Sequence, residues 1–250
     1  MHSKKHFIAN WKMNGLIKDL NHISRVSDYL KKIKKNDFNC TFCLPYTLLG
    51  LAKSRFDLKK INLGAQNFSV QDINSGPYTG SISINMLKDL KCKYVIIGHS
   101  ELRAKGETNL IIKTKIKYAL EKNLKIILCV GENLMQYKAN KSFQIVKNQL
   151  KLVLPKNKKD LRNIIIAYEP IWSIGTGIIP QNKYLNNFFN KISYYLKKDF
   201  KFSISLLYGG SVSSKNIKQF VNINKCNGFL IGGASLKSKN FIDIIKKYYN

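Results

Sequence analysis

The feature that most constrains the fold is a repeated alternation between short apolar runs and longer segments with helical periodicity. Most of the runs are continuously apolar instead of alternating with polar residues, which predicts strands that are buried on both faces. Eight such runs predict strands at Phe7–Trp11, Cys40–Leu44, Ile61–Ala65, Tyr94–Ile97, Ile126–Val130, Ile164–Tyr168, Ser205–Tyr208 and Phe229–Ile231.

The segments between these runs carry apolar residues at every third or fourth position. In Asn21–Ile33, for example, Ile23, Val26 and Leu30 share one helical face. Short helices are expected after Pro45 and after Ser83. Similar stripes predict helices in Ile111–Leu120, Phe143–Leu152, Leu185–Leu196, Ile217–Val221 and Phe241–Tyr248.

A strand followed by a helix, eight times in 250 residues, predicts an α/β protein with a (β/α)8 barrel. A doubly wound sheet is the architectural alternative, but no Gly-x-Gly-x-x-Gly motif follows the first strand. No Pro-, Gly- or Ser-rich linker divides the chain, so we expect one domain over residues 1–250. The longest irregular stretch, Gln66–Gly80, is longer than an ordinary barrel loop, which predicts that this loop has a separate function.

The chain is strongly basic, with 43 Lys and Arg against 14 Asp and Glu and a net charge of +29. Clustered basic residues would predict a nucleic-acid binder. Arginine binds phosphate and guanine with two parallel hydrogen bonds and is the residue that a recognition surface favours. It occurs only four times, however, and the lysines are spread along the whole chain. Lys, Asn and Ile share A/T-rich codons, so biased composition explains the charge. We therefore expect no specific nucleic-acid partner.

The cysteines and the apolar runs bear on the compartment. Five cysteines, an odd number, without a secretory signal predict free thiols in a reducing compartment. Cys40 and Cys43 have metal-ligand spacing, but they lie in a predicted strand, where residues three apart point to opposite faces. No run approaches the roughly 18 apolar residues of a membrane helix. We expect a cytoplasmic protein that contacts no membrane.

Polar and glycine residues gather just after the predicted strands. In a parallel barrel these strand ends meet at one mouth, where the functional site forms. Glycine pairs leave main-chain N–H groups open to an anion, and the loops after strands 7 and 8 commonly hold a phosphate. The groups at the strand ends are Asn10 and Lys12, Gly98-His99-Ser100-Glu101, Glu169-Pro170, Gly209-Gly210-Ser211 and Gly232-Gly233-Ala234-Ser235.

Three of these groups suit proton transfer on a small carbonyl compound. The Glu169 carboxylate could remove a proton next to a carbonyl, while His99 and Lys12 polarise that carbonyl and stabilise the enediolate. Each also has a structural alternative, since Glu169 could be a salt-bridge partner, His99 a core imidazole and Lys12 one lysine among many. No Walker loop, nucleophile elbow or His-Glu-x-x-His pair suggests another chemistry.

Several segments, in order along the whole chain, resemble the signatures of the triosephosphate isomerase family. They are Phe7–Asn14 (FIANWKMN), Ala65–Asn67 (AQN), Tyr94–Glu101 (YVIIGHSE), Cys129–Glu132 (CVGE), Ala167–Gly177 (AYEPIWSIGTG), Tyr208–Val212 (YGGSV) and Gly228–Leu236 (GFLIGGASL). The resemblance implies a TIM barrel that interconverts dihydroxyacetone phosphate and D-glyceraldehyde 3-phosphate through an enediolate, a step of glycolysis and gluconeogenesis. No metal or organic cofactor is implied.

The resemblance also implies roles for individual residues. Glu169 would be the base, a neutral His99 would polarise the carbonyl, Lys12 and Asn10 would complete the electrophilic side, and Glu101 would support them. The phosphate would lie against Gly175, Ser211, Gly232 and Gly233. Pro170–Gly177 would begin a lid that excludes water. The Gln66–Gly80 loop would form a homodimer, with Thr79 reaching the partner's site.

The lid departs from the family pattern. Ile178, Ile179 and Pro180 follow directly where the family usually has a Lys- and Ala-containing tip, and Ser173 stands where the hinge usually has Ala. Proline has no N–H to offer to Tyr208, so we expect weaker closure. There are two functional alternatives. One is a barrel retained for binding or scaffolding, and the other is a barrel adapted to aldol cleavage through a lysine deep in its interior.

Overall fold

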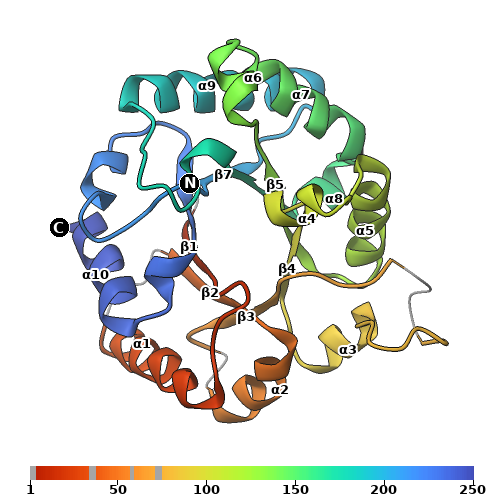
Figure 1. Cartoon of the computed structure of the whole chain (residues 1–250), viewed down its shortest axis with the longest axis vertical. Coiled ribbons are helices and arrows are strands. Elements are labelled where there is room, and N and C mark those ends of the chain that lie inside the picture. Colours follow the sequence, from red (N-terminus) through yellow and green to blue (C-terminus); the bar gives the residue numbers. More distant parts are fainter. Residues whose placement is uncertain (1–3, 34–37, 57–58, 71–74) are drawn as a thin grey trace.

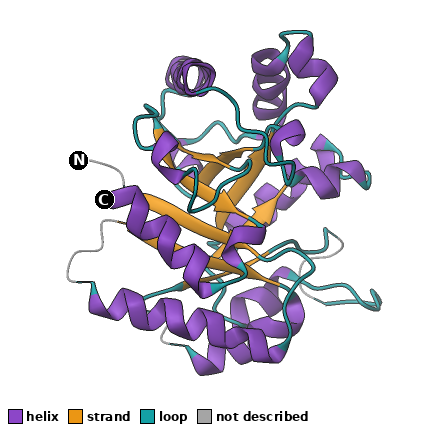
Figure 2. Ribbon diagram, turned by 60° about the vertical axis from the view of Figure 1, so that its left-hand side comes forward, coloured by secondary structure: helices purple, strands orange, loops and turns teal. Residues whose placement is uncertain are grey.

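The eight predicted strands form one closed ring. The computed structural model describes residues 4–33, 38–56, 59–70 and 75–250, and within it all eight strands are parallel and pair in sequence order, with the first strand also pairing with the last. The strands form the inner ring in Figure 1 and the helices surround them. The side view in Figure 2 shows the same two layers. The predicted (β/α)8 TIM barrel is therefore confirmed.

The strand positions agree closely with the apolar runs. Three predicted strands have the same bounds in the structure, and the others differ by one to three residues at their first or last residue. The strands are β1 (Lys5–Asn10), β2 (Phe38–Leu44), β3 (Asn62–Ala65), β4 (Tyr94–Ile97), β5 (Lys125–Val130), β6 (Ile164–Tyr168), β7 (Ser205–Tyr208) and β8 (Cys226–Ile231).

The long helices also follow the predicted stripes. The α-helices are α1 (Leu20–Lys32), α2 (Tyr46–Arg55), α3 (Ile84–Asp89), α4 (Ser100–Ala104), α5 (Asn109–Glu121), α6 (Leu134–Lys138), α7 (Ser142–Val153), α8 (Lys158–Leu161), α9 (Asn182–Asp199) and α10 (Ser238–Tyr249). The 3-10 helices are η1 (Ile17–Asp19), η2 (Ile171–Ser173), η3 (Ile217–Phe220) and η4 (Gly233–Ser235). The predicted helix Ile217–Val221 is thus a 3-10 helix.

Alternation along the strands separates two apolar cores. The larger core lies between the strands and the helices, and it includes Cys40 and Phe42 of β2. The smaller core fills the barrel interior and includes Ile8, Cys43 and Leu230. Cys40 and Cys43 therefore do point to opposite faces, as expected. Because side chains fill the barrel interior, a substrate can bind only at one of the two ends of the barrel.

All five cysteines are buried and free. Burial raises the pKa of each of these thiols above its usual value. They act as small apolar side chains in the two cores, which agrees with the expectation of free thiols. No helix in the described part of the chain is long and apolar enough to span a membrane.

Candidate active site

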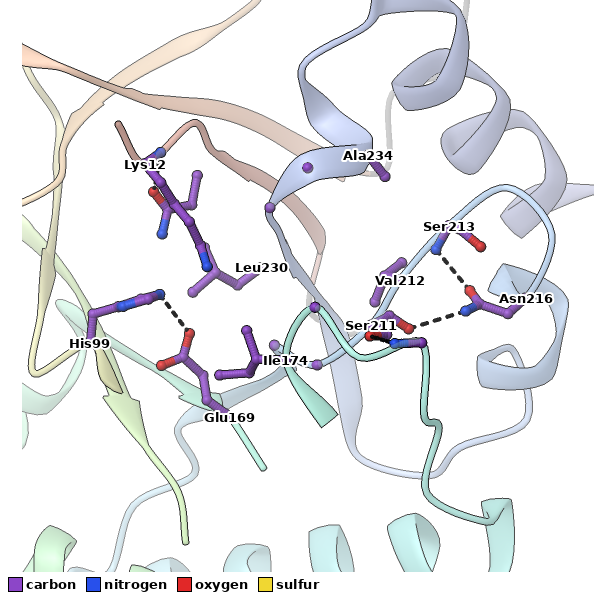
Figure 3. A pocket seen from close by; sticks show the side chains of 17 residues that line it. Lys12, His99, Glu169, Ile174, Ser211, Val212, Ser213, Asn216, Leu230 and Ala234 are labelled. Carbon is purple, nitrogen blue, oxygen red and sulfur yellow. Dashed lines mark hydrogen bonds and ion pairs between the residues drawn. The ribbon is translucent and has the colours of Figure 1, made fainter. Parts of the chain in front are cut away.

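A cavity of about 380 Å³ opens at the carboxyl ends of the strands. Figure 3 shows Lys12, His99 and Glu169 facing one another on one side of this cavity and Ser211 lying on the other. The sequence-predicted residues that line it are Asn10, Lys12, His99, Glu169, Gly175, Ser211, Gly232 and Gly233. Glu101 does not line the cavity and contacts it through Lys12.

Glu169 follows β6 directly and is buried at the cavity wall. Its Oε1 lies 3.2 Å from Nε2 of His99, and its Oε2 accepts the main-chain N–H of Ser100 at 3.3 Å. A Cβ at position 209 would lie 2.8 Å from Glu169 Cγ, so glycine there leaves the space that the glutamate occupies. The carboxylate is therefore held by the turn after β4, and the glycine after β7 leaves room for its side chain.

His99 comes two residues after β4 and precedes α4. Its Nδ1 accepts the main-chain N–H of Glu101 at 3.2 Å, so the proton of a neutral ring lies on Nε2, toward Glu169. Burial lowers the pKa of His99, but the charges of Glu169 and Glu101 and the hydrogen bond to Glu169 outweigh burial and raise this pKa above its usual value. The imidazole is thus a donor aimed at the space beside the carboxylate.

Lys12 projects its ammonium across the mouth of the barrel from the end of β1. Its backbone is left-handed, with φ at 54°, and its N–H donates to Asn10 Oδ1 at 3.0 Å. Its Nζ lies 2.7 Å from Glu101 Oε1. Burial raises the pKa of Glu101, but the hydrogen bond from Lys12 and the charges of His99 and Lys12 hold it below its usual value. The ion pair therefore fixes a cation next to the acid–base couple.

The opposite wall of the cavity is built from main chain. Gly232 and Gly233 follow β8 and begin η4, where a Cβ on Gly233 would meet nothing within 4 Å. The Asn216 side chain holds the neighbouring loop by donating to Ser211 O at 3.1 Å and by accepting from Ser213 N at 2.8 Å. Glycines that leave main-chain N–H groups accessible, facing a lysine, suit a small anion.

Residues 170–180 follow β6, and Ile174, Gly175 and Gly177 among them line the cavity. Trp172 Nε1 and the Tyr168 hydroxyl each donate to Glu132 Oε1 at 3.0 Å. The Trp172 ring stacks on Tyr137 with centroids 4.1 Å apart. Burial raises the pKa of Glu132, and these hydrogen bonds offset only part of that effect. The start of the segment is therefore anchored to the loop after β5.

Three contributions escaped the sequence analysis. The space that Gly209 leaves for Glu169 depends on a close approach between strands, and the Ser100 N–H depends on the turn into α4. Glu132 was visible as part of a motif, but no role followed from it.

The cavity offers little to other chemistries. Among the described residues, no group of three His, Cys, Asp or Glu could hold a metal ion. Lys12 is the only lysine that lines the cavity in the described part of the chain, so aldol cleavage through a lysine deep in the barrel lacks its nucleophile. The cavity places a carboxylate, an imidazole and a cation beside glycines that can bind a small anion. This arrangement supports proton transfer on a phosphorylated carbonyl compound.

Comparisons with known proteins agree with this chemistry. Residues 5–248 match the family model described as triosephosphate isomerase. The triosephosphate isomerases of Alkaliphilus metalliredigens and Mycoplasma mobile are 40% and 41% identical, over 97% of this chain and 99% of each relative. The crystal structure of the Bartonella henselae triosephosphate isomerase superposes with a TM-score of 0.88 at 35% identity, covering 99% of this chain and 100% of that one. The chain belongs to the triosephosphate isomerase family.

Proposed function

We propose that Glu169, His99 and Lys12 carry out the isomerisation at this cavity. As a triosephosphate isomerase, the chain interconverts dihydroxyacetone phosphate and D-glyceraldehyde 3-phosphate, a reaction of glycolysis. The observation that carries the residue assignment is the 3.2 Å contact between Glu169 Oε1 and His99 Nε2 at the wall of a cavity that Lys12 also lines. Each substrate has a carbonyl, a hydroxyl and a phosphate to be matched.

Glu169 acts as the base. Its carboxylate takes a proton from C1 of dihydroxyacetone phosphate, the electron pair of that C–H bond forms the C1–C2 double bond, and the carbonyl π pair moves to oxygen. The O1 hydroxyl proton then passes to the oxygen on C2, and the O1 electron pair forms the C1 carbonyl. The pair of the C1–C2 double bond takes the proton from the Glu169 carboxyl to form the C2–H bond, which gives the aldehyde and restores the carboxylate. Lys12, His99 and Asn10 stabilise the negative oxygen of the enediolate, and the Glu101 carboxylate orients Lys12 at 2.7 Å.

His99 acts as a neutral donor. In the arrangement seen, Nδ1 accepts the Glu101 N–H, which leaves the proton on Nε2. The negative charge of Glu169 raises the pKa of His99 in the free protein. When Glu169 takes the proton from carbon, its negative charge passes to the enediolate oxygen, and the Nε2–H of the neutral ring donates to that oxygen. The ring therefore stabilises the oxygen without itself becoming a cation.

The phosphate lies at the opposite wall, against Gly175, Ser211, Gly232 and Gly233. Residues 170–180 form the lid over it and exclude water, so that the enediolate does not lose its phosphate before the proton returns. The distance between the Glu169 carboxylate and the phosphate-binding glycines is set by the strand ends, because these groups follow different strands of one closed barrel.

We further propose that the chain works in the cytoplasm as a single domain that forms a homodimer. Loop 66–80 supports this, since its described part projects beyond the ring of helices in Figure 1 and Thr79 is exposed on it; residues 71–74 lie outside the described residues. Gln66 donates to the carbonyls of Lys12 and Cys43 at 3.0 and 3.1 Å, which joins this loop to the active-site loop. The neighbouring Met13 is 97% exposed, as an apolar contact residue would be in an isolated chain. Sedimentation should give twice the chain mass, and a monomer active at full rate would contradict this assembly.

The catalytic assignment is tested by replacing the base. Glu169→Gln keeps the size of the side chain and removes the charge, so kcat should fall by at least about 10²-fold, the scale of general base catalysis. The measurement is a coupled assay of triose phosphate interconversion. Glu121→Gln, at an exposed position of α5, is the matched control and should keep the wild-type rate. An unchanged rate in Glu169→Gln would reject the assigned base.

A further inference from the structure

The lid contains a buried serine that the catalytic scheme does not use. Ser173 ends η2 and is fully buried. Its Oγ lies 2.6 Å from the carbonyl of Ile178 and 3.0 Å from the hydroxyl of Tyr208. A single hydroxyl therefore contacts the tip of the lid and the end of β7 at once.

The chemistry of the two partners fixes the direction of both hydrogen bonds. A carbonyl can only accept, so the Ser173 hydroxyl donates its one proton to Ile178 O. The Tyr208 hydroxyl then donates to Ser173 Oγ. A Cβ at position 210 would lie 2.2 Å from the Tyr208 hydroxyl oxygen and 2.8 Å from Ser173 Oγ, so Gly210 leaves room for this pair.

A second serine closes the connection on the cavity side. Ser211 Oγ donates to the Ser173 carbonyl at 2.6 Å and accepts the N–H of Gly177 at 3.3 Å. Both serines thus join the beginning of the lid to its tip, and Ser211 also lines the cavity. Gly175 and Gly177, which line the cavity, lie between Ser173 and Ile178 in the sequence, within the segment that these hydrogen bonds close.

Pro180 gives this arrangement its significance. Proline has no N–H, so the main chain at position 180 has no donor to offer the buried Tyr208 hydroxyl. Ser173 supplies a hydrogen-bond partner for that hydroxyl from within the lid. An alanine at position 173 would leave the Tyr208 hydroxyl and the Ile178 carbonyl without this partner, and unpaired buried polar groups are costly.

We propose that Ser173 is a positioning residue whose hydroxyl fastens the lid tip to Tyr208 and so keeps the lid closed during turnover. This inference rests on the proposed function, in which residues 170–180 shield the enediolate. The expected consequence of losing it is a lid that opens too early. The enediolate would then lose inorganic phosphate more often than in the native protein. In this elimination the oxygen electron pair on C1 re-forms a carbonyl, the C1–C2 double bond moves to C2–C3, and the C3–O bond breaks with its electron pair leaving on the phosphate.

The test compares isomerisation with phosphate release in the same samples. In Ser173→Ala, kcat/KM should fall about 5- to 10-fold, the scale of one hydrogen bond, and the phosphate released per isomerisation should rise by a similar factor. Simple loss of folded protein lowers both rates together and leaves their ratio unchanged. Ser54→Ala, which removes a hydroxyl bound to the Leu51 carbonyl on the exposed side of α2, is the matched control.

A double-mutant cycle identifies the partner. Tyr208→Phe should raise the same ratio, and Ser173→Ala/Tyr208→Phe should raise it no further than the larger single change. Ser173→Cys, which fills the site with a slightly larger and weakly donating side chain, provides a second variant if alanine proves unstable. A ratio equal to that of Ser54→Ala, or effects of the two substitutions that multiply, would overturn the proposal. Because Glu169→Gln tests isomerisation itself, a failure of the lid inference is distinguishable from a failure of the base assignment.

Discussion

Two buried histidines lie at opposite mouths of this barrel and have opposite electrostatic surroundings. His99, 5% exposed, faces the carboxylates of Glu169 and Glu101, which raise its pKa. His6, 8% exposed, lies at the other mouth, where burial and the charge of Lys125 lower its pKa to about 4. Burial is nearly the same for the two rings, so the difference comes from the charges around them.

The cavities at the two mouths are also similar in size. The one beside His6 has a volume of about 320 Å³ and is lined by Lys4, Lys125 and Arg162, with no carboxylate among its described lining residues. The one beside His99 has about 380 Å³ and combines a carboxylate, an imidazole and a lysine. A polar cavity with a buried histidine is therefore not enough for chemistry; opposite charges must be placed within reach of one ring.

The largest expected difference between the mouths is in turnover. His99→Gln should lower kcat by about 10²-fold or more, because it removes the donor that polarises the carbonyl. His6→Gln, the same substitution at the other mouth, should stay within about twofold of the wild type, since its ring does not line the catalytic cavity. Steady-state kinetics of both variants would break the comparison if His6→Gln were the slower enzyme.

The next effect concerns stability at low pH. His6 has a pKa near 4 in the folded protein and about 6.5 in the unfolded chain, so the unfolded chain binds more protons. Its contribution to the free energy of unfolding is therefore present above pH 6.5 and is lost as pH falls toward 4. The loss should reach about 3 kcal/mol at most. It is measured by urea unfolding between pH 7 and 4 at one protein concentration.

His6→Gln isolates this contribution, because its stability should fall less steeply over the same pH range than that of the wild type. His99 works in the opposite sense, since a raised pKa adds stability that is lost as pH rises through it. Lys125→Met gives the smallest change and should raise the pKa of His6 slightly in an NMR titration. Parallel pH profiles for the wild type and His6→Gln would show that His6 is not the group responsible.

The fold was predictable because the pattern of apolar residues along the chain marks the strands and the long helices. The bounds of β4 and β6 follow from their apolar residues alone, whereas β1 and β5 each begin on a lysine that the hydrophobic pattern does not include. The short helices α4, α6 and α8 were not predicted, because capping contacts and neighbouring loops hold them and no apolar stripe marks them.

The candidate site was predictable only in its membership. Strand ends converge in any parallel barrel, so Lys12, His99 and Glu169 could be expected at one mouth. The electrostatic contacts could not be predicted in detail, since the 3.2 Å approach of Glu169 to His99 and the charge of Lys125 beside His6 depend on tertiary structure. The bond between Ser173 and Tyr208 spans 35 residues and likewise depends on tertiary structure.

The five cysteines have a practical consequence. Reactivity toward alkylating reagents requires an exposed thiolate, and all five thiols are buried with raised pKa values. The native chain therefore offers a nearly silent background for labelling chemistry. A single cysteine introduced at the exposed Ile178 would carry a fluorophore on the proposed lid, without the need to replace the native cysteines first.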